Sequence, residues 1–92
     1  MDIQKVIFNA VKDRGYLRGE VLMEQQKQVL KALEELGEVA ACVFDGRAIP
    51  VNEIADVLIP LFLLAELQHE DLLEAALLKA NSDIKRGVRG GN

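Results

Sequence analysis

The stretch VLIPLFLLA, residues 57–65, is the longest unbroken apolar run of the chain and decides the fold class. Its nine residues are too few to cross a membrane, which takes about 20 apolar residues in a helix. A helix that is apolar on every face is instead surrounded by protein. Pro60, in the middle of the run, removes one backbone hydrogen bond and is expected to kink the helix.

The pattern of apolar residues on either side of this run predicts an all-α chain, a four-helix bundle without strands. The helices are expected at Ile3–Lys12, at Glu20–Phe44, from after Pro50 to Gln68, and at Asp71–Arg86. Asn52 is the expected N-cap of the third helix, and Asp71 and Glu74 form a capping box at the start of the fourth. Residues 1–86 are thus predicted to form a single domain, followed by a flexible tail at 87–92.

The composition limits the partners and the compartment. The net charge of −4 argues against a nucleic-acid polymer as the main partner, because such a partner requires clustered Lys and Arg. The single Cys42 excludes an internal disulfide and is too little for a structural zinc site. The N-terminus has no signal-peptide pattern and no segment is long enough to span a membrane, so a cytoplasmic protein is expected.

An apolar seam along the second predicted helix indicates packing in a bundle, because its residues recur at alternating steps of four and three. The seam comprises Val29, Leu33, Leu36, Ala40 and Val43. A bundle of 92 residues can hardly surround the apolar helix at 57–65 by itself. A homodimer or homotetramer is therefore expected, with that helix near the interface.

Two acidic motifs flank the turn between the second and third helices, EELGE at 34–38 and NEIAD at 52–56. Glu35 and Glu38 are three positions apart, as are Glu53 and Asp56, so each pair projects from one face of its helix. One interpretation is a solvated polar face opposite the seam, together with first-turn acids that complement a helix dipole. The other is that the two pairs converge and hold a cation.

A converging set of four carboxylates in a partly dry cleft repels itself unless protons or cations neutralise it. Ligands that are all oxygen favour a hard ion, Mg²⁺ or Mn²⁺ rather than Zn²⁺. Carboxylates that leave coordination positions open also allow the ion to take phosphate oxygens. No Ser-His-Asp or Cys-His arrangement competes with this site, and His69 is expected to be a surface residue.

The pattern E-E-x-x-E at 34–38, followed by E-x-x-D at 53–56, resembles the signature of the all-α nucleoside triphosphate pyrophosphohydrolases, and most of all their MazG-like branch. The segments KALEELGEVA and NEIADVLIPLFLLA read much like family segments, and the resemblance spans about residues 10–86. Pro60 departs from the family, which usually has an ordinary helix former there. The resemblance implies helical bundles that dimerise or tetramerise and use Mg²⁺ to hydrolyse a nucleoside triphosphate to a monophosphate and pyrophosphate.

Carried over residue by residue, the resemblance implies four metal ligands: Glu35, Glu38, Glu53 and Asp56. Glu35 or Glu38 would also act as the catalytic base, Glu34 would be a supporting acid, and Lys31 would meet a phosphate. In the fourth helix the candidates to face the nucleotide are Lys79, Asn81 and Arg86. The spacing of these three departs from the family's usual pattern.

Recognition of a nucleobase requires an apolar or aromatic wall, and Tyr16, in a loop next to Gly15, is the candidate for stacking on it.

The sequence leaves three functions open. The first is an Mg²⁺-dependent pyrophosphohydrolase that removes non-canonical or surplus nucleotides. The second is a dUTPase-like or phosphoribosyl-ATP pyrophosphohydrolase activity on the same fold, and the third is a non-catalytic helical dimerisation or regulatory module.

Overall fold

The protein is described by a computed structural model that covers residues 2–86 and the side chains of residues 2–84. Its helices are α1 (Ile3–Asp13), α2 (Val21–Phe44), α3 (Val51–Leu67) and α4 (Leu72–Arg86), and the described residues include no strand. The predicted all-α class with four helices is confirmed. The tail predicted at 87–92 lies outside the described residues. None of the described helices is long and apolar enough to cross a membrane.

The helix starts confirm one predicted cap and correct another. Asp71 caps α4, because its Oδ1 accepts a hydrogen bond of 2.9 Å from the backbone N–H of Glu74. Asn52 is not the N-cap of α3, so that prediction is wrong. The helix starts at Val51, directly after Pro50, because the Pro50 carbonyl already accepts a hydrogen bond of 3.0 Å from Glu53 N–H. Asn52 therefore lies inside the first turn.

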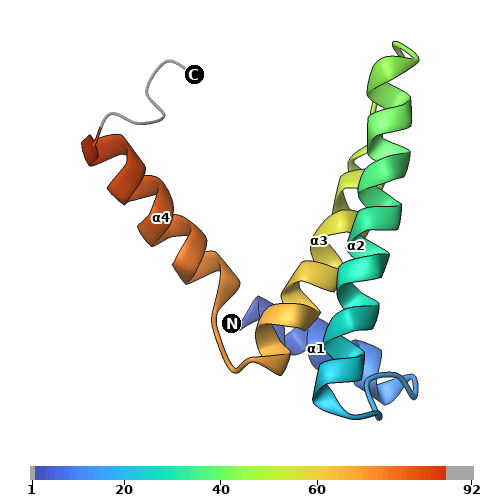
Figure 1. Cartoon of the computed structure of the whole chain (residues 1–92), viewed down its shortest axis with the longest axis vertical. Helices are drawn as coiled ribbons and strands as arrows, with labels where there is room; N and C mark the ends of the chain where they lie inside the picture. The colour runs from blue at the N-terminus through green and yellow to red at the C-terminus, as the bar shows by residue number, and fades with distance from the viewer. Residues whose placement is uncertain (1, 87–92) are drawn as a thin grey trace.

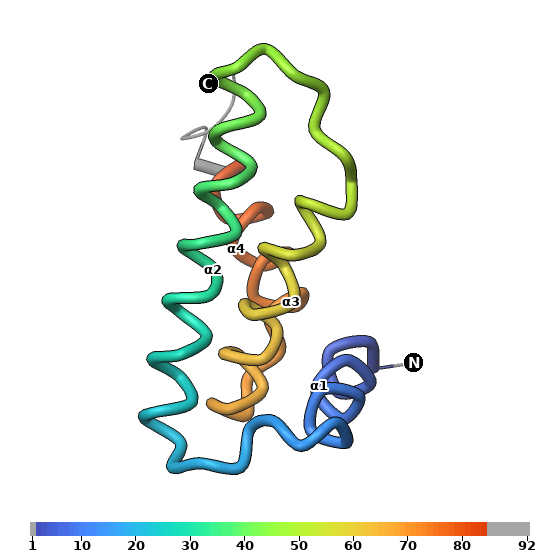
Figure 2. The backbone as a smooth tube through the Cα atoms, turned by 90° about the vertical axis from the view of Figure 1, so that its right-hand side faces the viewer, coloured from blue at the N-terminus to red at the C-terminus, as the bar shows by residue number. Residues whose placement is uncertain are grey.

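Helices α2 and α3 run antiparallel side by side, and α1 crosses α3 near its C-terminal end (Figures 1 and 2). The buried apolar side chains of the described chain come from these two long helices: Ala32, Cys42, Phe62 and Leu63. Pro60 lies inside α3 without ending it and is buried. The small core thus sits between α2 and α3.

The face of α2 that meets α3 is not the predicted apolar seam. Leu33 is 61% exposed and Leu36 is 52% exposed, so the seam faces away from α3. The covered stripe instead carries Ala32, Glu35 and Cys42, which are all buried. Because these three residues also recur at helical spacing, α2 has two candidate packing faces, and the chain itself covers the more polar one.

Helix α4 stands apart from α2 and points away from the α2–α3 pair (Figure 1). Its position is fixed near its start by Gln4 of α1, which is 5% exposed. The Gln4 Nε2 donates to Glu66 Oε1 at 2.9 Å and to the Glu70 carbonyl at 2.6 Å. Its Oε1 accepts from Leu72 N–H at 2.9 Å. One buried amide therefore ties α1 to the turn between α3 and α4.

Candidate functional site

The acidic residues of α2 and α3 meet where the middle of α2 lies against the first two turns of α3. Carboxylate oxygens of Glu35, Glu53 and Asp56 lie within 4.8 Å of one another. The same holds for Glu34, Glu35 and Glu38. We call these five residues the acidic cluster; Glu35 belongs to both groups and joins them. The antiparallel packing of the two helices thus brings together acids that are 15 or more positions apart in the sequence.

Burial separates two members of this cluster from an ordinary solvated helix face, while Glu34, Glu38 and Asp56 are exposed. Glu35 is only 7% exposed, and Glu53 is half-buried. The Oε2 atom of Glu53 is inaccessible and has no hydrogen-bond partner among the described residues. A buried carboxylate oxygen without a partner is costly, and a proton or a cation removes that cost. The all-oxygen donor set fits a hard divalent ion such as Mg²⁺.

Two residues in and beside this cluster, Lys31 and Glu38, form interactions with Glu35 that shift pKa values. The Lys31 Nζ lies 3.0 Å from Glu35 Oε1 and 3.5 Å from Glu34 Oε1. Its hydrogen bond to Glu35 lowers the pKa of that carboxyl and raises the pKa of Lys31. The pKa of Glu38 is raised, first because its carboxyl group shares a hydrogen bond with Glu35, and then because of the charge on Glu35 and burial. The lowered pKa of Glu35 favours its anionic form, while the raised pKa of Glu38 makes it take up a proton more readily than an ordinary glutamate.

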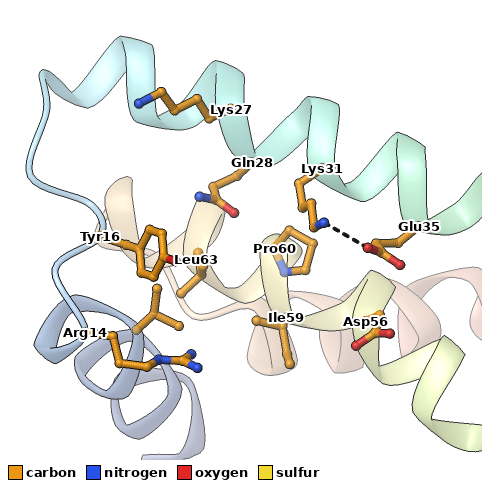
Figure 3. Close-up of a pocket in the computed structure, with 11 residues that line it drawn as sticks. Arg14, Tyr16, Lys27, Gln28, Lys31, Glu35, Asp56, Ile59, Pro60 and Leu63 are labelled. Carbon is orange, nitrogen blue, oxygen red and sulfur yellow. Dashed lines mark ion pairs between the residues drawn. The ribbon is translucent and has the colours of Figure 1, made fainter.

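A cavity of about 510 Å³ opens beside the cluster, between α2, α3 and the end of α1. Glu35 and Asp56 line one end, and Arg14 and Tyr16 line the other (Figure 3). Its volume falls in the range of small-ligand sites, roughly 300–1,000 Å³. The cavity is therefore acidic at one end and carries an aromatic ring and a guanidinium at the other.

Residues of α2 and α3 make up the walls between these two ends. Lys27, Gln28 and Lys31 of α2 line one side, and Ile59, Pro60 and Leu63 of α3 form an apolar floor. Figure 3 shows the Lys31 ammonium turned toward Glu35 and the Gln28 amide turned into the space between the helices. The cavity thus combines an apolar surface with several hydrogen-bonding groups.

The loop that presents Tyr16 has a defined conformation. Gly15 has φ 97°, and Leu17, which is not a glycine, has φ 64°. This left-handed conformation costs a non-glycine residue roughly 1–2 kcal/mol. Glu24 holds the far side of the loop, because its buried Oε2 accepts a hydrogen bond of 2.8 Å from Gly19 N–H. A Cβ atom on Gly19 would lie 2.8 Å from that same oxygen, so a larger residue there would make the Glu24 side chain shift.

The structure places the predicted site residues in two groups. The five acids, Lys31 and Tyr16 lie at or beside the cavity. Lys79 and Asn81 lie on the exposed surface of α4, where Lys79 Nζ is 3.5 Å from Asp83 Oδ1. None of the described side chains of α4, at residues 72–84, lines the cavity. Arg86 ends α4, and its side chain lies outside the described residues.

Arg14, Lys27 and Gln28 line the cavity but were not predicted from the sequence. The sequence does contain a pattern that indicates Lys27 and Gln28, because residues 27, 28, 31 and 35 of α2 follow helical spacing and so share one face. Arg14 has no such signal, since it caps the C-terminal end of α1 and its position depends on how α1 packs against α3.

No protein-family model matches this chain, and searches of curated proteins and of solved structures found no match to it either. The resemblance to the MazG-like family therefore rests on the two acidic motifs, their spacing and the residues around them.

Proposed function

We propose that the protein is an Mg²⁺-dependent nucleoside triphosphate pyrophosphohydrolase of the MazG-like type. The observation that carries the proposal is the convergence of Glu35, Glu53 and Asp56 within 4.8 Å, with Glu53 Oε2 buried and lacking a partner among the described residues. A structural polar face does not require such an arrangement, whereas an ion-binding site does. Non-canonical or surplus nucleotides in the cytoplasm are the proposed substrates.

The proposed roles of the site residues follow from their charges. Glu35, Glu38, Glu53 and Asp56 would hold Mg²⁺, which, when bound, neutralises charge on the phosphoryl oxygens and lowers the pKa of a bound water. Glu38, whose pKa is already raised by Glu35, takes the proton of the attacking water. Lys31 lies between the acidic cluster and the cavity and donates to a phosphate oxygen in place of Glu35.

A non-catalytic module is the second candidate, and one contact favours it. The 3.0 Å ion pair between Lys31 and Glu35 neutralises one carboxylate without any metal. In that case Mg²⁺ would have little effect on stability. In the catalytic case, Mg²⁺ at roughly 100 times its Kd stabilises the fold by about 2.7 kcal/mol and raises the melting temperature.

The test is pyrophosphate release from a panel of ribo- and deoxyribonucleoside triphosphates, with Mg²⁺ and with EDTA. The panel includes dUTP and phosphoribosyl-ATP, which separate the pyrophosphohydrolase activities from one another. Glu38→Gln is expected to lower kcat by about 10²–10⁴-fold, because the proton acceptor is lost. Full activity of that variant, or no release by the wild type at any substrate, would reject the proposal. Asp45→Asn, an exposed acid paired with Arg47 at 3.1 Å, is the matched control.

A further inference from the structure

We propose that the cavity end opposite the acidic cluster binds a nucleobase, stacked on Tyr16, and that Arg14 and Gln28 select bases with a carbonyl oxygen at the edge. The favoured bases are 6-oxopurines and uracil, over adenine and cytosine, which carry an amino group at that position. The inference rests on the proposed function and names the substrate class of the same site.

The distance between Gln28 and Glu35 along α2 is suited to one nucleoside. Gln28 and Glu35 are separated by seven residues of α2, which is two helical turns or roughly 10 Å along the axis. A phosphate held at the acidic cluster places the attached sugar over the middle of the cavity and the base near Gln28. Tyr16 and Leu63 stand at that end, away from Glu35 and Asp56 (Figure 3).

Tyr16 and the apolar residues of α3 line the same cavity and offer surfaces on which a flat ring can pack. The Tyr16 side chain is 63% exposed, so it has free surface for a stacked base. Leu63, Pro60 and Ile59 line the same cavity as the tyrosine and supply the apolar surface on the α3 side. Aromatic rings favour offset stacking on other π systems, and such pairs are stabilised beyond the effect of the area they bury.

The hydrogen-bonding groups at this end are mostly donors. The Arg14 guanidinium carries donors only, and Gln28 offers both a donor and an acceptor. Neither side chain forms a hydrogen bond or ion pair with any other side chain that the structure describes, so both are free for a ligand. Lys27, the other cation there, is partly engaged by Glu24 at 3.8 Å. A donor-rich end pairs with a carbonyl oxygen and leaves an amino group without an acceptor from Arg14.

The experiment is a titration of the full-length protein with inosine and with adenosine, which carry no phosphate and need no metal. The chain has one tyrosine and no tryptophan, so the ring-proton NMR signals of Tyr16 report directly on stacking. Inosine is expected to shift these signals with a Kd roughly tenfold lower than that of adenosine. Arg14→Gln is expected to bring the two Kd values together, and Tyr16→Leu, followed by calorimetry, to weaken both equally.

Arg47→Gln is the matched control, because Arg47 is exposed and lies beyond the far end of α2, beside Asp45. This variant is expected to leave the ratio of the Kd values of inosine and adenosine unchanged. Equal affinities in the wild type, unshifted Tyr16 signals, or a preference that survives Arg14→Gln would each overturn the base site.

The result of this titration can be distinguished from the result of the assay that tests the proposed function. Binding of inosine with the expected preference, but no pyrophosphate release from any nucleotide, supports the base site and rejects the hydrolase. Mg²⁺-dependent release without any shift of Tyr16 supports the hydrolase and rejects the base site.

Discussion

Glu35 and Glu38 lie one turn apart on α2, yet their environments push their pKa values in opposite directions. Lys31 stabilises the anionic form of Glu35 through a contact of 3.0 Å. Among the described side chains no cation pairs with Glu38, which instead shares a hydrogen bond with Glu35, whose charge raises the pKa of Glu38. Two neighbouring carboxyl groups with separated pKa values are suited to different roles, one as a permanent ligand and the other as a proton acceptor.

The metal-free protein is expected to be stabilised by Glu38→Gln at pH 7. The pKa of Glu38 is raised above its ordinary value of 4.5 in the folded chain, so its charged form destabilises the fold. That penalty is fully present above the raised pKa and is absent below the ordinary one. Melting in EDTA should therefore give a melting temperature above that of the wild type at pH 7, and the difference should shrink as the pH falls toward 4.

The same melting curves for Asp45→Asn provide the control, because this exposed carboxylate lies beside Arg47 and contributes little. A Glu38→Gln variant that is less stable than the wild type at pH 7 would show that Glu38 supports the metal-free fold.

Glu53→Gln is expected to remove the stabilisation that Mg²⁺ gives to the wild type. The buried Oε2 of Glu53 has no partner in the described chain, and the amide nitrogen that replaces an oxygen cannot coordinate a cation. Melting temperatures with Mg²⁺ and with EDTA should differ in the wild type and coincide in the variant. Glu74→Gln, an exposed acid on α4, should respond to Mg²⁺ as the wild type does. An Mg²⁺ response that persists in Glu53→Gln would exclude this residue as a ligand.

For single residues, the sequence predicted the acidic pairs but not the residues that surround them. Spacing of three within each motif was enough to place Glu35 with Glu38 and Glu53 with Asp56, because helical geometry is local. The approach of one pair to the other depends on how α2 and α3 pack. Arg14 lies outside any periodic pattern, and only the end of α1 brings it to the cavity.

The four helices illustrate what can and cannot be inferred from periodicity. Each predicted helix exists, and Asp71 caps α4 as expected. The orientation of α2 was not predictable in the same way, because its seam through Leu33 and its stripe through Ala32 both have helical spacing. The tertiary structure turns Ala32 toward α3 and leaves Leu33 exposed. The interpretation as a solvated polar face is therefore wrong for Glu35, which is buried together with Ala32 where α2 packs against α3.

Gln4→Ala is expected to destabilise the fold by roughly 1–3 kcal/mol. The buried amide makes three hydrogen bonds to Glu66, Glu70 and Leu72, and its removal leaves their groups without these partners. Urea denaturation followed by circular dichroism measures the change. Lys5→Ala, at an exposed position of the same helix, is the matched control and should change stability by less than about 0.5 kcal/mol. Equal midpoints for the two variants would show that this link is dispensable.

Across the whole molecule, apolar surface is left over after the chain has folded. Leu33 and Leu36 on α2 and Leu77 on α4 are all more than half exposed. A groove between α2 and α3 is lined by Leu22, Val29, Leu30 and Leu64. An exposed apolar groove of this kind marks an interaction site, and a second copy of the chain is our proposed partner.

Light scattering is expected to give at least twice the chain mass of 10.2 kDa. Leu33→Glu should lower the measured mass to that of one chain, because a charge in the buried interface has no partner there. Lys5→Glu, at an exposed position of α1, should leave the mass unchanged. A monodisperse wild-type species of 10.2 kDa would contradict the proposed assembly.

The sequence by itself determined the all-α class, the approximate ends of the four helices and the two acidic pairs, because these depend on interactions between residues a few positions apart. Only the tertiary structure decided that α2 turns its acidic side toward α3, that Glu53 buries an unpartnered oxygen and that Arg14 reaches the cavity. It also decided that α4, with Lys79 and Asn81, stands away from that cavity. The physical reason is that the choice between two helix faces depends on the free energy of packing over the whole chain, which local spacing does not contain.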